Sequence, residues 1–171
     1  ADTVVLGRCV GDKALAAVGA TAVFIQLIAW IFIGLSAGVS VGIAQDFGAG
    51  DDDSLTKSIH TAMTSSVFIG IILMALGFFL ARTVLRLRGT PEEIIDGSVL
   101  YLKIFVLGVP ATLVYQFGAA VMRALGDSKK PVFYLAFSGG LNVVLNLIAV
   151  LVFKLEIIGV AAATVISQYV S

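Results

Sequence analysis

The chain has 171 residues, of which 59% are hydrophobic and 13% are charged, and its 11 basic and 11 acidic residues give a net charge of zero. Soluble domains carry roughly 25% charged residues, so these few charges cannot cover the folded chain in water, and lipid must be its solvent. Zero net charge removes the electrostatic basis for binding nucleic acid. The sequence holds no metal-spaced His/Cys cluster, phosphate-binding glycine loop or nucleophile–base pair, which argues against an enzyme and a bound cofactor.

Long uncharged stretches divide the chain into membrane helices, because a bilayer core about 30 Å thick needs roughly 20 apolar residues of helix. Residues 1–10 are expected to be the tail of a preceding span. The sequence therefore predicts an all-α, polytopic transmembrane bundle with about four complete and two partial helices. The complete spans are expected at 14–45, 58–81, 104–122 and 131–153, and an incomplete one at 157–171.

Polar turns separate these spans. Residues 48–54 form an acidic turn, in which neighbouring aspartates cannot converge on a cation, so a solvated turn is the favoured interpretation. Thr90 and Pro91 predict a helix start, with Thr90 as the cap and Pro91 at the first helical position. Residues 126–131 form a charged turn before the next span.

The first long span carries Gly34, Gly38 and Gly42 on one helix face. Small residues at this spacing let membrane helices approach closely, so we expect helix packing here rather than a direct role in substrate binding. Gln26 and Trp30 share a face of the same span. Packing or interfacial anchoring is the favoured interpretation for this pair, with Gln26 kept as a candidate cavity-lining residue.

Polar groups at membrane depth are costly and are therefore candidates for a functional site. Ser138, Asn142 and Asn146 recur every four residues and lie on one helix face. The spacing fits either a cavity wall or hydrogen bonds between helices. Asp2 is the only acidic residue that could lie within the partial first helix, where a carboxylate could exchange a proton or bind a cation; a position in a terminal loop is the alternative.

Six motifs lie in order along essentially the whole chain. They are A-D-T-V-V-L-G-R (1–8) with A-L-A-A-V-G (14–19), G-L-S-A-G-V-S-V-G-I-A-Q-D-F-G-A-G-D (34–51), G-T-P-E-E-I (89–94), R-A-L-G-D-S-K-K-P (123–131), N-V-V-L-N (142–146) and G-V-A-A-A-T-V-I-S-Q (159–168). Tyr101-Leu102 follows the third motif. In order and spacing these motifs match the amino-terminal half of multidrug and toxic compound extrusion (MATE) transporters, and the chain resembles that family over essentially its whole length.

The resemblance implies a multi-pass protein of the cell (plasma or inner) membrane, with twelve helices in two lobes. Such proteins exchange organic cations or other amphipathic compounds for protons or sodium ions by alternating access. Residues 1–171 would form a single lobe, from the end of helix one through most of helix six, and its missing partner would be the carboxy-terminal lobe of the same chain. The lipid bilayer and small amphipathic or cationic substrates are the other expected partners.

The resemblance also implies roles for individual residues. The family aspartate of helix one falls on Asp2, and the Asn-x-x-x-Asp pair of helix five falls on Asn142 and Asn146, which implies ion coupling at these three positions. The second member of the pair is Asn here, so Asp2 is the only carboxylate at the implied site. Tyr101 and Thr164 fall near positions that line the lobe cavity.

The positive-inside rule and the family disagree on orientation. Seven basic residues fall on one side and four on the other, which favours the seven-residue side as cytoplasmic. The family instead places the turns at 46–57 and 123–130 in the cytoplasm, and we expect that orientation because motif order is more specific than charge bias. The two sets are Arg8, Lys13, Arg82, Arg86, Arg88, Lys103 and Lys154, and Lys57, Arg123, Lys129 and Lys130.

Two other functions fit the sequence less well. A flippase of the same superfamily, moving a lipid-linked saccharide, predicts a strongly cationic cavity, whereas the spans contain few basic residues. A small membrane scaffold or assembly subunit without transport of its own would suit the glycine face. A homologous second lobe would argue against the scaffold.

Overall fold

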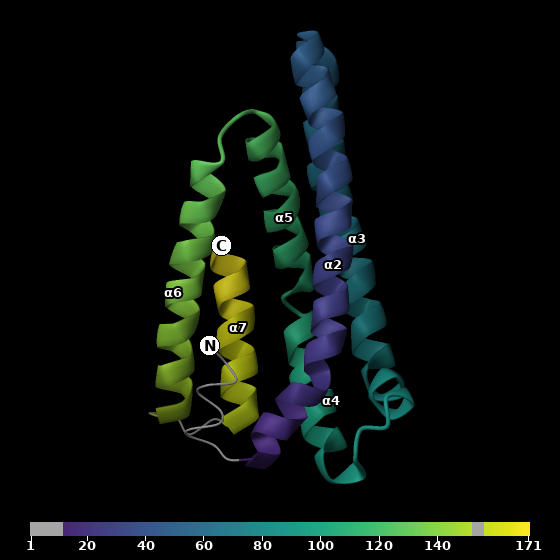
Figure 1. The fold of residues 1–171 in the computed structure, drawn as a ribbon, viewed down its shortest axis with the longest axis vertical. Coiled ribbons are helices and arrows are strands. Elements are labelled where there is room, and N and C mark those ends of the chain that lie inside the picture. The colour runs from purple at the N-terminus through teal and green to yellow at the C-terminus, as the bar shows by residue number, and fades with distance from the viewer. Residues whose placement is uncertain (1–11, 152–155) are drawn as a thin grey trace.

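The computed structural model describes residues 12–151 and 156–171. Each helix in this part is followed by one that runs the opposite way, except that α5 continues the direction of α4 (Figure 1). Asp2 lies outside the described residues. The helices are α2 (Asp12–Ala49), α3 (Asp52–Leu87), α4 (Glu92–Val106), α5 (Val109–Ala124), α6 (Lys129–Leu151) and α7 (Glu156–Val170).

Three of these helices are long and apolar enough to cross a membrane: α2, α3 and α6. Helices α4 and α5 pass the same test as a pair bent by 45°, and α7 contributes a shorter apolar helix, Ile157–Val170. Large apolar side chains cover the outside of the bundle; Phe79, for example, is 82% exposed. An apolar exterior around paired backbone groups suits lipid and not water, so the polytopic transmembrane bundle is confirmed.

The third span differs from the expected single helix at 104–122. The structure begins this helix at Glu92 and interrupts it at Leu107 and Gly108. Pro110 causes the break, since it has no N–H for the carbonyl of residue 106 and its ring crowds that carbonyl. The start of the span was misjudged because Lys103 ends the uncharged stretch, whereas the helix start predicted at Thr90 and Pro91 agrees with α4 beginning at Glu92. The Lys103 ammonium lies 4.8 Å from the centre of the Phe78 ring.

The helix starts are only partly as expected. At α4 the N-cap position belongs to Pro91, which makes no side-chain cap hydrogen bond, so the prediction of Thr90 as cap was wrong. At α3 the acidic turn supplies a cap: Asp51 Oδ1 accepts from the backbone N–H of Ser54 at 3.0 Å, and Oδ2 accepts from its hydroxyl at 2.7 Å. These hydrogen bonds hold the pKa of Asp51 below its ordinary value.

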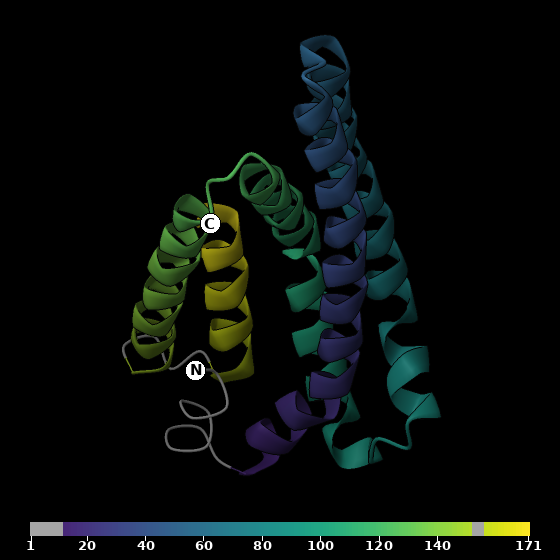
Figure 2. The ribbon, with the colours of Figure 1, turned by 45° about the horizontal axis from the view of Figure 1, so that its top comes forward.

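Two groups of helices make up the bundle. Helices α4 and α5 both pack against α2 and α3, and their shared core includes Leu85, Leu102 and Leu113, all fully buried. Helix α7 packs against α6 and α4. Figure 2 shows α6 and α7 side by side and apart from the α2–α3 hairpin.

Close glycine packing occurs on a different helix from the expected one. A Cβ atom added to Gly34, Gly38 or Gly42 of α2 would meet no atom within 4 Å in the described part of the chain. On α3, by contrast, a Cβ at Gly70 would lie 2.7 Å from Pro110 Cα, and one at Gly77 the same distance from Val106 Cγ1. Helix α3 therefore contacts the bent α4–α5 pair through glycine, on both sides of the break.

Candidate functional site

A seam of amide and hydroxyl groups joins α6 to α7. The α6 face predicted from the sequence points at α7: the Ser138 hydroxyl donates to the carbonyl of Ser167 at 2.7 Å. One turn further along α6, Asn142 Nδ2 lies 3.3 Å from both Thr164 Oγ1 and Ser167 Oγ. Asn146 Nδ2 then donates to Asn142 Oδ1 at 3.1 Å. These five residues are the polar seam.

Hydrogen bonds to the α7 backbone hold the two hydroxyl groups of the polar seam on that helix in place. The Thr164 hydroxyl donates to the carbonyl of Val160 at 3.0 Å, and the Ser167 hydroxyl to that of Thr164 at 2.8 Å. Both hydroxyl oxygens can therefore accept from Asn142, which orients its amide. Hydrogen bonds between helices, one of the two alternatives for the polar face of α6, are thus present in the described structure.

Tyr101 lies beside the polar seam. Its side chain is 2% exposed and belongs to a buried cluster that contains Val150 of α6 and Val160 of α7. Val150 is one helical turn from Asn146, and Val160 is one turn from Thr164. The predicted site residues of α4, α6 and α7 therefore gather in one region, where Asn146 is fully buried.

The other site predictions concern Gln26, further residues of α7 and metal ligands. Gln26 lies exposed on α2 and makes no hydrogen bond to the polar seam, so its cavity-lining role stays a prediction. Ser167 was missed from the sequence, although its position three residues after Thr164 signals a shared helix face. Over the described residues, no three His, Cys, Asp or Glu side chains come together as a metal site.

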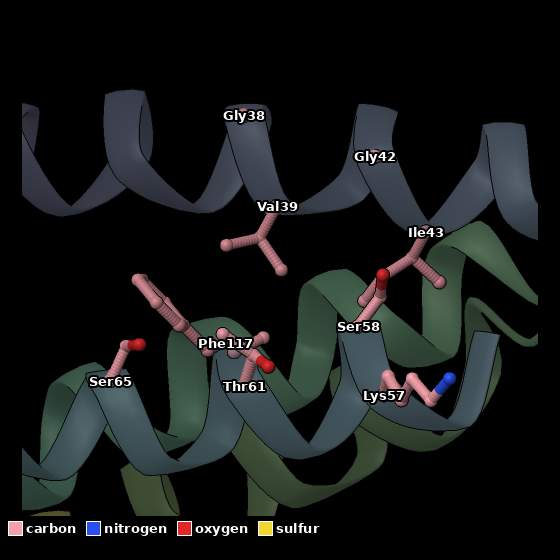
Figure 3. A pocket seen from close by; sticks show the side chains of 10 residues that line it. Gly38, Val39, Gly42, Ile43, Lys57, Ser58, Thr61, Ser65 and Phe117 are labelled. Carbon is pink, nitrogen blue, oxygen red and sulfur yellow. The ribbon is translucent and has the colours of Figure 1, made fainter. Parts of the chain in front are cut away.

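Apart from the polar seam, a hollow that sequence reasoning did not find lies between α2, α3 and α5. Its volume is about 370 Å³, and Figure 3 shows Val39, Ile43 and Phe117 among the apolar side chains at it. Helix α3 supplies the polar side, where the Ser58 hydroxyl donates to Asp46 Oδ2. The signal for it is the hydroxyl spacing along one α3 face. The polar residues that line the hollow are Lys57, Ser58, Thr61 and Ser65.

The chain matches a protein-family model and several known transporters over most of its length. The MatE family model matches residues 1–148. The probable multidrug resistance proteins YpnP and YoeA of Bacillus subtilis are 33% and 34% identical to it, over 98% and 95% of the chain. The FAD transporter of Shewanella oneidensis is 28% identical over the whole chain. The chain spans only 38%, 36% and 38% of the lengths of these three relatives.

Solved structures agree at the level of the fold. A MATE protein in a bent conformation superposes with a TM-score of 0.93 at 24% identity, covering 99% of this chain and 38% of that one. An inward-facing multidrug resistance MATE transporter of the MOP superfamily superposes with a TM-score of 0.90 at 25% identity, again over 99% of this chain and 38% of that one. The chain therefore belongs to the MatE family, whose members are multi-pass membrane transporters and not enzymes.

Proposed function

We propose that the chain forms one lobe of an ion-coupled antiporter, which exports organic cations or other amphipathic drugs by alternating access. The observation that carries the proposal is the convergence of Tyr101, Asn142, Asn146 and Thr164 in one region, where Tyr101 and Asn146 are buried, in a member of a transporter family. Polar groups held at membrane depth are the usual marks of an ion or substrate pathway. The relatives named as multidrug resistance proteins support the substrate class.

In this proposal Asp2 receives the coupling ion, which is a proton or a sodium ion. Asn142 and Asn146 supply amide oxygens, which can coordinate a hard cation but cannot accept a proton at ordinary pH. Loading of Asp2 favours a rearranged lobe with lower affinity for the bound drug. A ligand can drive such a change only through its different affinity for the two states.

The test is Asp2→Asn in the full-length protein, measured as efflux of a fluorescent organic cation from cells or proteoliposomes under an imposed proton or sodium gradient. We expect ion-driven efflux to be lost while the protein level in the membrane stays unchanged. Asp53→Asn, at an exposed position in the first turn of α3, is the matched control and should leave efflux intact. Normal efflux by the Asp2 variant would refute the coupling assignment.

The proposal also assigns a partner, the carboxy-terminal lobe of the same polypeptide. The greater length of the relatives supports it, since the chain covers 38% of YpnP. The intact mass of the product of the native locus tests this assignment. A mass well over twice the 17.8 kDa of these 171 residues is expected, whereas a mass near 17.8 kDa would favour self-association or a scaffold role.

A flavin dinucleotide is a second candidate substrate, because the Shewanella oneidensis relative is named as an FAD transporter. The two substrate classes differ in charge: FAD is an anion with two phosphates, and the multidrug substrates in the proposal are cations. Uptake into inverted vesicles should therefore be measured with an organic cation and with FAD in parallel. Transport of FAD alone would replace the drug assignment.

A further inference from the structure

The break between α4 and α5 leaves backbone carbonyls without their usual helical partners. Pro110 has no N–H to donate to the carbonyl of Val106, which would be its partner in a continuous helix. The chain crosses the break with tighter turns instead: the Leu107 N–H donates to the carbonyl three residues earlier at 3.1 Å. In lipid a free carbonyl costs several kcal/mol, so this break requires partners from elsewhere.

Helix α7 supplies one such partner. The Tyr169 hydroxyl donates to the carbonyl of Leu107 at 3.0 Å, across 62 residues of sequence. The neighbouring Gln168 only packs there: its side-chain Oε1 lies against Gly108, at the point where a Cβ of any other residue would stand, and makes no hydrogen bond within the described residues. Gly108 is the N-cap residue of α5, and a helix N-terminus attracts the negative end of an amide dipole.

Helix α3 encloses the other side of the break. Its Gly70 contacts Pro110, and its Gly77 contacts Val106, each so closely that a Cβ would stand 2.7 Å from the neighbouring atom. Gly70 and Gly77 are seven residues apart and so lie on one face of α3. The break therefore lies between a glycine face of α3 and the last turn of α7.

We propose that Tyr169 is a positioning residue: its hydroxyl braces the α4–α5 break so that Tyr101 keeps its place beside the polar seam. Tyr101 lies six residues before Leu107 on α4, and Thr164 lies five residues before Tyr169 on α7. The Tyr169 contact thus joins the two helices about two turns from Tyr101. The brace itself rests on geometry alone; its effect on ion coupling also rests on the proposed function.

Amide hydrogen exchange in the full-length protein tests the brace without any transport assay. Tyr169→Phe removes the hydroxyl and should speed exchange in the first turn of α5, at the Thr112 N–H that donates to the carbonyl of Gly108 at 3.0 Å, by about threefold, the value of one hydrogen bond between membrane helices. The control is Tyr134→Phe, which removes an exposed hydroxyl from α6 and should change nothing there. Unchanged exchange in the Tyr169 variant, or equal changes in both variants, would overturn the brace.

A double-mutant cycle tests whether the Tyr169 hydroxyl acts at the α4–α5 break. Pro110→Ala restores an N–H for Val106 and allows a continuous helix, in which Ala111 can donate to the Leu107 carbonyl. The Tyr169 hydroxyl is then redundant. Adding Tyr169→Phe in that background should speed exchange by less than threefold; a full threefold effect would show that the hydroxyl acts elsewhere.

An efflux assay separates a failure of the brace from a failure of the proposed function. Tyr169→Phe should shift the proton or sodium concentration that half-saturates efflux by at least about threefold, with a smaller change in maximal rate, and Tyr134→Phe should shift neither. Wild-type ion dependence in a Tyr169 variant with faster exchange would refute the positioning role. If the unmodified protein shows no ion-driven efflux, the proposed function fails, and the exchange data still decide the brace.

Discussion

Asn142 links α6 to α7 through its side-chain amide, one turn from the Ser138–Ser167 hydrogen bond. Its Nδ2 reaches two hydroxyl oxygens, of Thr164 and Ser167, and its Oδ1 accepts from Asn146. An amide can do this because it has two donor hydrogens and an acceptor oxygen with two lone pairs. No aliphatic side chain could fill this position without leaving partners unsatisfied.

Asn142→Ala should therefore lower the free energy of unfolding by about 1–2 kcal/mol, since hydrogen bonds between membrane helices contribute up to about 1.7 kcal/mol each. Thermal unfolding in detergent, followed by the loss of the monodisperse chromatographic peak, measures the change. Val143→Ala, at the next and lipid-exposed position, is the control and should cost less. Equal losses in the two variants would mean that the polar seam adds no stability.

Asp51 makes the start of α3 sensitive to acid. Hydrogen bonds from Ser54 hold its pKa below the ordinary value of 3.8, so the unfolded chain takes up this proton at a higher pH than the folded one. The cap therefore stabilises the fold fully above about pH 3.8 and is lost as the pH falls through the lower, folded-state pKa.

Asp51→Asn keeps the cap, because Asn also accepts at this position, but removes its titration. Unfolding midpoints measured between pH 7 and pH 2.5 should fall less steeply at the acid end for this variant than for the unmodified protein. Asp53→Asn, in the first turn of α3, leaves the Asp51 cap in place and should retain the steeper fall. Identical slopes for all three proteins would contradict a titrating cap.

At the scale of elements, the α4–α5 pair depends on how closely α3 can approach. Gly70 and Gly77 allow contact with Pro110 and Val106, whereas the glycines of α2 are open in the described part of the chain. Both helices carry glycines along one face, four residues apart at Gly34, Gly38 and Gly42 of α2 and seven residues apart on α3. Which glycines are packed depends on the rotation of each helix about its axis, and this rotation is decided by the neighbouring helices.

Gly70→Ala should destabilise the protein by about 1–3 kcal/mol, the usual cost of overpacking, because its Cβ meets backbone atoms that cannot turn aside. Gly139→Ala on α6 is the matched control, with no atom within 4 Å of its added Cβ. The control should be neutral or more stable by up to about 1 kcal/mol, owing to the better helix propensity of Ala. A neutral Gly70 variant would refute the close approach.

At the scale of the whole molecule, α2 and α3 are longer than a membrane span. Their 38 and 36 residues extend about 57 and 54 Å at 1.5 Å per residue, against about 35 Å for the 23 residues of α6. The α2–α3 hairpin consequently extends beyond the α5–α6 turn (Figure 1). Both turns lie at the same end of the bundle, and the α3–α4 turn lies at the opposite end.

Labelling of single cysteines in a Cys9→Ser background checks this arrangement. Ala49→Cys and Ser128→Cys should react with a membrane-impermeant maleimide from one side of the membrane, and Arg88→Cys from the other. In the expected orientation the first two react from the cytoplasmic side. Reaction of Ala49→Cys and Ser128→Cys from opposite sides would contradict the fold, and reaction of both from outside would reverse only the orientation.

The sequence by itself determined where most of the membrane helices lie, the transmembrane class and the polar face of α6, but not the break between α4 and α5. These features depend on patterns within one helix: the length of an apolar stretch, and the return of Ser138, Asn142 and Asn146 every four residues. The helix ends were less accurate, because helices continue through charged residues such as Lys103 when a partner ring or water lies nearby.

Only the tertiary structure decided which helices meet. The pairing of the α6 face with Thr164 and Ser167, the glycine contact at Gly70 and the hydroxyl of Tyr169 on the break join residues up to 62 positions apart. A local pattern shows which side of a helix is polar or small, but it does not show what that side contacts. The contacts follow from packing all the helices at once, where each rotation must satisfy every neighbour.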